Sequence, residues 1–140
     1  VVVLSHPDSL ADTTNLVPLA FRGWTVSSLS LDYRGRAAFL VETVVQPGSA
    51  GSPVLLLRRS TDPSRPVTRL SLLGLLSHVA TATGSGEMAS RPIGSPDWNA
   101  QGGPVFNLAV ACRSTAIAEA IRSRMPNGGH SPFLEKGSVP

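Results

Sequence analysis

The chain has 140 residues, a formal net charge of +3 and only 15% charged residues. This length corresponds to one domain that can bury a sizeable core. The positive charge comes from scattered arginines without any run of five basic residues, so we expect no nucleic-acid surface. No stretch approaches the roughly 18 apolar residues of a membrane span. The start of the chain also lacks the features of a signal peptide, so we expect a soluble protein of unassigned compartment.

Six stretches have the apolar runs or the alternation of apolar and polar residues that predict strands. From the N-terminus they are 1–4, 17–31, 37–45, 53–59, 67–81 and 105–112. The second and third flank the turn sequence DYRGR and predict a β-hairpin. Residues 82–104 are rich in Gly, Ser and Pro and predict a long irregular loop.

Two residues inside the predicted strands carry expectations of their own. Gly74 interrupts the fifth strand and predicts a bulge or the close approach of another backbone. Cys112 is the single cysteine, so no intramolecular disulfide can form. Its place in the apolar run FNLAVAC predicts a buried core thiol.

One helix is predicted after the last strand. Ser114 is its expected N-cap, and Ile117 and Ile121 share one face at the i, i+4 spacing. The sequence PNGG at 126–129 is expected to end it. We therefore predict an all-β fold, a six-stranded antiparallel β-barrel with a C-terminal helix over 1–125, followed by a flexible tail over 126–140.

The stretch QPGSAGSPVLLL, residues 46–57, combines a glycine-flanked turn, a proline and an apolar run. A serine nucleophile needs a tight turn that holds its hydroxyl out, with backbone N–H groups aimed at the developing oxyanion. Glycines permit the unusual dihedral angles of such a turn, and a proline fixes the exit into the next strand. The segment 46–53, called the motif loop below, has each of these parts except the hydroxyl, because Ala50 stands at its centre.

The motif Gly48-Ser49-Ala50-Gly51-Ser52-Pro53 resembles the G-x-S-G-[GS]-P signature of trypsin-like serine peptidases at five of six positions, and the nucleophile is the one that differs. LLGLLSH at 72–78 and FNLAVACRSTAIAEAI at 106–121 resemble the later strands and closing helix of the family's second barrel. The resemblance covers nearly all of 1–121. It implies that the chain is the C-terminal half of a chymotrypsin-like double barrel.

The resemblance also implies a role for particular residues. Gly48 and Ala50 supply the two N–H groups of the oxyanion hole, and Ala50 occupies the nucleophile position. Val44 lies at the base of the specificity pocket, and because it brings no carboxylate, a small or apolar substrate side chain is expected rather than Arg or Lys. The strand 107–110 forms one wall. The remaining residues implied to bind substrate are Ser49, Ser77, His78 and Val79, and the family usually has glycine at the position of Val79.

The catalytic His and Asp of this family belong to an N-terminal barrel that precedes everything seen here. Of the three histidines, His78 lies nearest to the cleft, where it is a candidate general base or a cleft-lining or structural residue. His6 and His130 are expected in turns. The spacing of histidines and cysteine fits no metal site, so we expect no metal and no cofactor.

Two other interpretations of the motif loop stay open on the sequence. Ser49 or Ser52 is a candidate nucleophile if the register of the motif is shifted. The loop is also compatible with a Gly/Pro turn that has no chemistry.

The resemblance implies a serine endopeptidase domain that hydrolyses peptide bonds and is inactive as written, because it has Ala50 and no His/Asp barrel. Its partners are then a peptide or protein substrate and an N-terminal barrel, or a partner chain, that carries His and Asp. The alternative is a non-catalytic pseudoprotease that binds a peptide or protein through the former cleft, by strand addition near Ser77. The alanine is compatible with an engineered replacement of serine or with a natural one.

Overall fold

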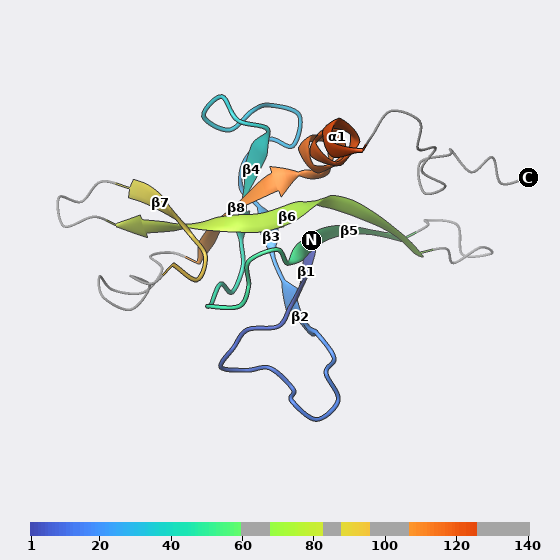
Figure 1. The fold of residues 1–140 in the computed structure, drawn as a ribbon, viewed down its shortest axis with the longest axis vertical. Coiled ribbons are helices and arrows are strands. Elements are labelled where there is room, and N and C mark those ends of the chain that lie inside the picture. The colour runs from blue at the N-terminus through green and yellow to red at the C-terminus, as the bar shows by residue number, and fades with distance from the viewer. Residues whose placement is uncertain (60–67, 83–87, 96–106, 126–140) are drawn as a thin grey trace, which may run out of the picture.

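The computed structural model describes residues 1–59, 68–82, 88–95 and 107–125, which form eight strands and one helix (Figure 1). The strands are β1 (Val2–Ser5), β2 (Leu19–Arg22), β3 (Trp24–Thr25), β4 (Ala38–Glu42), β5 (Pro53–Arg59), β6 (Thr68–Ala82), β7 (Met88–Pro92) and β8 (Leu108–Arg113), and the helix is α1 (Ser114–Arg124).

The strands form one antiparallel sheet that nearly closes on itself. Its order is β2-β1-β5-β6-β8-β4-β3, and β7 pairs with β6 off this path. The strands at the two ends of the order, β2 and β3, are separated in the chain by Gly23 alone. Two hydrogen bonds join Gly23 to Val1, the residue before β1. The N–H of Gly23 donates to the Val1 carbonyl at 3.0 Å, and the Val1 ammonium donates to the Gly23 carbonyl at 2.9 Å. The prediction of an antiparallel barrel-like sheet with one helix is confirmed at this level, but the predicted count of six strands is not, because the described residues form eight.

The prediction of one continuous strand over 17–31 is wrong. Only β2 and β3 form there, and Leu29 and Leu31 are 41% and 68% exposed outside any strand. The ladder between β3 and β4 stops because the N–H of Leu40 donates to the hydroxyl of Ser27 at 2.8 Å. A serine side chain thus replaces the main-chain acceptor that a longer strand would supply. The predicted pairing with 37–45 is present, since Trp24 lies opposite Glu42 and Thr25 opposite Val41.

The strand β7 also differs from expectation, since residues 82–104 were predicted to be irregular. It pairs with the second half of β6 from His78↔Pro92 to Ala82↔Met88. The Gly, Ser and Pro content of this stretch hides a short strand that its long partner stabilises. Residues 83–87 and 96–104 of the predicted loop lie outside the described residues.

The core lies on one face of the sheet and is built from alternate residues of the strands. Phe39 and Val41 of β4 face inward opposite Ala111 and Ala109 of β8, and all four are fully buried. The same alternation places Cys112 on the outer face, so the thiol is exposed and the prediction of a buried cysteine is wrong.

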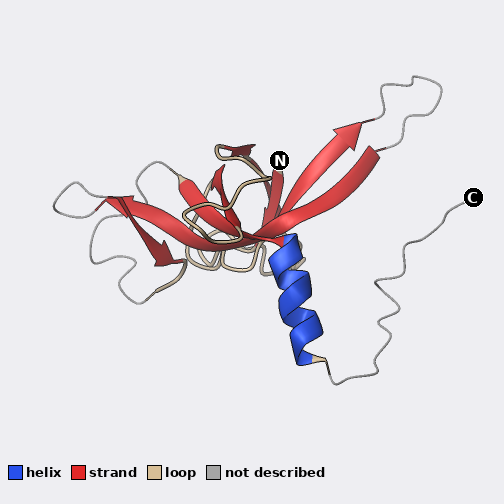
Figure 2. Ribbon diagram, turned by 90° about the horizontal axis from the view of Figure 1, so that it is seen from above, coloured by secondary structure: helices blue, strands red, loops and turns tan. Residues whose placement is uncertain are grey.

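The helix α1 follows β8 without an intervening turn and leaves the sheet, as the view in Figure 2 shows. Its N-cap is Arg113, which makes no side-chain cap hydrogen bond, so the predicted cap at Ser114 is wrong by one residue. The chain passes straight from an extended residue into the helix, which leaves Ser114 as the first helical residue. Ile117 is half-buried, whereas Ile121 is 49% exposed. The expected stop at 126–129 and the tail over 126–140 lie outside the described residues.

A substitution at Gly74 tests the close approach of β6 and β8. A Cβ at this position would overlap the carbonyl oxygen of Cys112 and lie 3.0 Å from the ring of Phe39. Because that carbonyl belongs to the neighbouring strand, we expect Gly74→Ala to lower the free energy of unfolding by about 3 kcal/mol, the upper end of the cost of overpacking. Urea denaturation measures this loss.

Gly35→Ala is the matched control. Nothing lies within 4 Å of its added Cβ, and only its φ of +69° opposes the change. We expect a loss of about 1 kcal/mol from the dihedral angle alone. Equal losses in the two variants would contradict the steric role of Gly74.

Candidate functional site

The motif loop consists of two successive β-turns. In each, the N–H of the last residue donates to the carbonyl of the first, at 2.9 Å over 46–49 and at 3.3 Å over 49–52. The third residue of each turn is a glycine with positive φ, +86° at Gly48 and +79° at Gly51. That is the φ that type II turns require at this position. Ala50 is therefore the second residue of the second turn, where its side chain is exposed.

Two backbone donors flank Ser49 in this loop. Among the described residues, none accepts a hydrogen bond from the N–H of Gly48 or from the N–H of Ala50. Both residues are exposed. These are the two groups to which the resemblance assigns the oxyanion hole.

The strand β6 anchors the motif loop. The N–H of Gly51 donates to the carbonyl of Leu76 at 2.8 Å, and the N–H of Leu76 donates to the carbonyl of Ser52 at 2.9 Å. Leu76 is 1% exposed and belongs to the core. The loop therefore lies against the rigid part of β6, directly beside Ser77.

The two serines of the loop are structural. Ser49 and Ser52 are 1% and 5% exposed, so neither hydroxyl can reach a substrate. The Ser49 hydroxyl accepts hydrogen bonds from the Ser5 hydroxyl at 3.1 Å and from the Gln46 N–H at 3.2 Å. This burial argues against the shifted register, and it makes the Ser49 side chain an anchor of the loop rather than a group that touches a ligand.

A second segment, residues 6–10, packs on the motif loop and was not recognised in the sequence. The N–H of Asp8 donates to the carbonyl of Pro47 at 3.0 Å, and the Ser9 hydroxyl donates to Oε1 of Gln46 at 2.7 Å. A Cβ on Gly48 would overlap Oδ1 of Asp8 and lie 2.7 Å from the His6 carbonyl oxygen. The Asp8 carboxylate thus lies beside an oxyanion donor, where its charge opposes a bound anion.

The same connection carries a self-contained turn further along. Asp12 accepts hydrogen bonds from the Asn15 N–H and side chain and from the Thr14 N–H, and these bonds lower the pKa of its carboxyl. The turn is exposed, and it orders the chain between the motif-loop contact and β2.

Ser77 forms a bulge in β6, since the register with β8 shifts between Leu76 and His78. The Ser77 hydroxyl donates its one proton to the Val110 carbonyl at 3.0 Å. It must therefore accept from Nδ1 of His78, which lies 3.0 Å away. Neutral His78 then carries its proton on Nδ1 and its lone pair on Nε2.

The other predicted cleft residues are distributed over different faces of the barrel. His78 is half-buried on the outer face, whereas Val79 is fully buried in the core, so only the backbone of Val79 is available to a ligand. Val44 is 38% exposed. It lies next to the expected wall at 107–110, because the N–H of the preceding Thr43 donates to the Asn107 carbonyl at 2.9 Å.

The edge of β6 after Ser77 is already paired. His78 lies opposite Pro92, Val79 opposite Arg91, and the N–H of Ile93 donates to the Ser77 carbonyl at 3.1 Å. In this structure β7 thus occupies the position where a peptide strand would add.

His6 is exposed in the 6–10 segment, and His130 lies outside the described residues. No three His, Cys, Asp or Glu side chains gather as metal ligands within the described ranges. Within those ranges, too, no helix combines the length and the apolar character needed to cross a membrane.

Comparison of the chain with protein-family models, with curated proteins and with solved structures finds no match. The likeness of the motif loop to trypsin-like peptidases therefore rests on the residues of this chain.

Two glycine substitutions test the contact between the motif loop and the 6–10 segment. Gly48→Ala and Gly51→Ala meet the same dihedral cost, about 1–2 kcal/mol for a left-handed residue. Only Gly48→Ala also meets Asp8 and His6, since nothing lies within 4 Å of a Cβ on Gly51. We expect Gly48→Ala to lower the free energy of unfolding by at least about 1 kcal/mol more than Gly51→Ala, from added overpacking. Urea denaturation of both variants decides this, and equal losses would show that the packing of the segment is loose.

A double-mutant cycle tests the buried Ser5–Ser49 hydrogen bond. Each single change to alanine leaves a buried polar group without its partner, and we expect each to cost about 1–2 kcal/mol of unfolding free energy. The double variant removes both hydroxyls, so its loss should be smaller than the sum of the single losses by at least about 0.5 kcal/mol. Additive losses in thermal or urea unfolding would show that the two hydroxyls do not interact.

Proposed function

We propose that the chain is the C-terminal barrel of a trypsin-like serine peptidase, inactive because Ala50 replaces the nucleophile. One observation carries the proposal. The motif loop presents an exposed residue, Ala50, in a turn where its own N–H and that of Gly48 have no acceptor among the described residues. Unpaired N–H groups at the centre of a turn are common, so the proposal rests on their combination with the buried hydroxyl anchor at Ser49 and with the position of Ala50 in the motif.

The chemistry of such a site follows from these groups. A serine at position 50 would attack the carbonyl carbon of the scissile peptide bond, and the carbonyl oxygen would become an oxyanion held by the N–H groups of residues 48 and 50. A histidine supplied by a second barrel would take the serine proton and pass it to the leaving amine, and an aspartate would orient that histidine. With alanine at position 50 the covalent step cannot occur.

His78 does not fit the part of the general base. Its Nδ1–H donates to Ser77 and leaves the Nε2 lone pair free, so the place of the ring rather than the tautomer decides against it. Its ring lies on the outer face of the sheet, in a pocket lined from β4, β6, β7 and β8. The base is therefore assigned to the second barrel that the resemblance implies.

A non-catalytic peptide-binding domain is the second candidate. Two features favour it, Ala50 itself and the Asp8 carboxylate beside Gly48, because each opposes oxyanion chemistry. On this alternative a peptide reaches β6 only if it displaces β7 from the edge at His78. The codon at position 50 of the source gene distinguishes the two candidates, since a serine codon there rules out a natural pseudoprotease.

Restoring the nucleophile tests the first candidate. Ala50→Ser is made in the chain as its source produces it and assayed together with an N-terminal barrel of the family, using a fluorophosphonate probe for activated serines. We expect covalent labelling of the restored serine and none of the unchanged chain, because only the variant has an exposed hydroxyl on the residue that carries one of the two N–H donors.

Two matched variants control this experiment. Ala20→Ser places a hydroxyl on an exposed residue of β2 and should remain unlabelled. Adding Gly48→Ala to Ala50→Ser keeps the N–H of residue 48 but displaces it, because the new Cβ would overlap Oδ1 of Asp8, so the labelling rate should fall by up to about 10²–10³, the cost of losing one oxyanion donor. Absence of labelling in Ala50→Ser, with the barrels assembled, would reject the peptidase assignment.

A further inference from the structure

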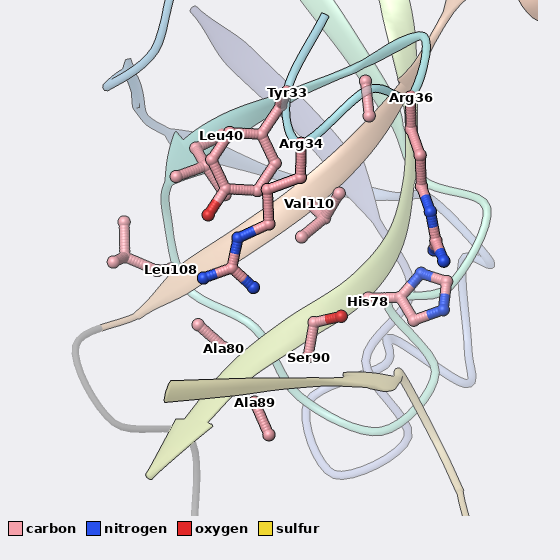
Figure 3. A pocket seen from close by; sticks show the side chains of 11 residues that line it. Tyr33, Arg34, Arg36, Leu40, His78, Ala80, Ala89, Ser90, Leu108 and Val110 are labelled. Atoms are coloured by element: carbon pink, nitrogen blue, oxygen red, sulfur yellow. The ribbon is translucent and has the colours of Figure 1, made fainter. Parts of the chain in front are cut away.

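The outer face of the sheet holds a pocket that the proposed peptidase chemistry does not use. It has a volume of about 240 Å³ and opens under the turn at residues 33–36 (Figure 3). This volume lies below the roughly 300 Å³ at which pockets for drug-sized ligands begin, so it suits a smaller molecule. The lining residues are Tyr33, Arg34, Arg36, Ala38, Leu40, His78, Ala80, Ala89, Ser90, Leu108 and Val110.

The floor of the pocket is apolar and rigid. Leu40, Val110 and His78 stand in one cross-strand row, because Leu40 pairs with Val110 and Val110 pairs with His78. These residues alternate with the core residues of the same strands and therefore face the other way. The floor is thus the reverse side of the barrel core, and it cannot collapse without disturbing that core.

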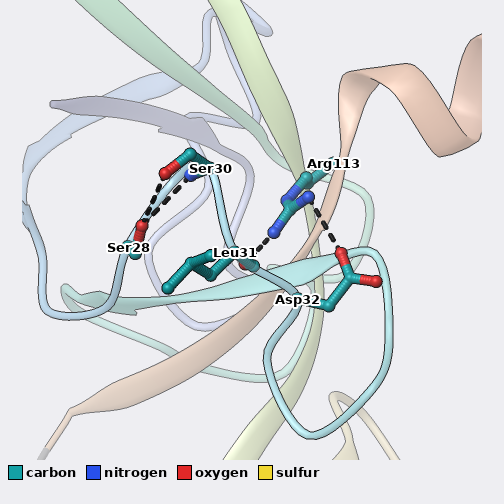
Figure 4. A network of polar contacts seen from close by, with 5 residues as sticks. All are labelled: Ser28, Ser30, Leu31, Asp32 and Arg113. Atoms are coloured by element: carbon teal, nitrogen blue, oxygen red, sulfur yellow. Dashed lines mark hydrogen bonds and ion pairs between the residues drawn. The ribbon is translucent and has the colours of Figure 1, made fainter.

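The rim is cationic. Arg34 and Arg36 extend their guanidinium groups over the pocket from the 33–36 turn, and His78 lies on the side of Arg36 (Figure 3). None of the lining residues in the described part of the chain is acidic. The nearby carboxylate of Asp32 is paired with Arg113 at 2.9 Å, and Arg113 also donates to the Leu31 carbonyl (Figure 4). Within the described part of the chain, neither rim arginine has an ion-pair partner.

The backbone holds one of these arginines at a conformational cost. Tyr33 and Arg36 form a β-bridge, and the two residues between them have positive φ, +53° at Arg34 and +69° at Gly35. These are the angles of a type I′ turn, whose second position favours Asn, Asp or Gly. Neither a core contact nor an ion pair offsets this cost at Arg34, and its guanidinium stacks on the Tyr33 ring at 5.5 Å, at the mouth of the pocket. A strained residue kept in place at a cavity is a sign of ligand binding.

We propose that this pocket binds a small organic carboxylate with a short apolar chain. The apolar chain lies on the floor formed by Leu40, Ala80 and Val110, and the carboxylate accepts hydrogen bonds from the guanidinium groups of the rim. Arginine suits this role because its planar donors match a carboxylate in pairs. The site is separate from the motif loop, and the proposal stands whether or not the chain belongs to a peptidase.

The test uses hexanoate as the probe, followed by ¹H–¹⁵N NMR titration of the whole chain. We expect saturable shifts at millimolar hexanoate, centred on Tyr33, His78 and Val110. Hexanol and hexylamine, which have the same apolar chain without the carboxylate, should bind at least tenfold more weakly. Equal binding of hexanol, or no saturable shift with hexanoate, would overturn the proposal.

Variants separate the two parts of the site. The double variant Arg34→Gln with Arg36→Gln should weaken hexanoate at least tenfold, whereas Arg22→Gln, which removes an arginine stacked on Trp24 outside the pocket, should leave it unchanged. Ser90→Leu, at the β7 position that pairs with Ala80 and points toward the pocket (Figure 3), fills the pocket without changing its charge and should also abolish binding. Arg34→Gly relieves the positive φ, so it should raise the melting temperature while it weakens hexanoate. Binding that survives both Ser90→Leu and the double variant would place the carboxylate elsewhere.

Discussion

The two main-chain hydrogen bonds between the motif loop and Leu76 are the constraint on which the rest of the structure depends. They join the loop to β6 at a residue that is 1% exposed, in the strand that pairs with β5, β7 and β8. Because Leu76 cannot shift without opening the core, the turn that carries Ala50 has a fixed position relative to the barrel. The positive φ values of Gly48 and Gly51 are then consequences of a chain that must leave β4, pass Leu76 and enter β5 within a few residues.

The negative charge of Asp8 opposes the anion binding that the unpaired N–H groups of the motif loop favour. Two unpaired N–H groups favour a bound anion, yet the Asp8 carboxylate lies where a Cβ of Gly48 would be. A carboxylate beside an oxyanion raises the energy of the charged state, and water around this exposed loop screens the effect in part. The two N–H groups to which the resemblance assigns an oxyanion hole therefore lie in an environment that weakens anion binding. Assembly with a second barrel that moves or neutralises Asp8 would remove this opposition.

The sequence was sufficient where a local pattern decides the structure. The Gly and Pro positions of 46–53 predicted a presented turn, and apolar runs located most strands of the barrel-like sheet. The sequence was insufficient where contacts with residues far away in the chain determine the local structure. The contact of Asp8 with Gly48 joins two loops that no periodicity connects. Ser27 ends β3 through a hydrogen bond to Leu40, and β7 exists because β6 continues far enough to pair with it. The apolar run around Cys112 led to the wrong prediction of a buried thiol. The alternation of buried residues at Ala109 and Ala111 would have placed the thiol on the outer face.

The bulge at Ser77 explains how one strand serves both the motif loop and the pocket. Without the extra residue, strict alternation after the buried Leu76 would send His78 to the core face and Val79 outward. The bulge reverses this order, so Val79 closes the core and His78 joins the row of Leu40 and Val110 beneath the arginines. The Ser77 hydroxyl stabilises the bulge by bridging the Val110 carbonyl and Nδ1 of His78. The motif loop, which bonds to Leu76, and the pocket, which His78 lines, thus lie on either side of the bulge residue Ser77.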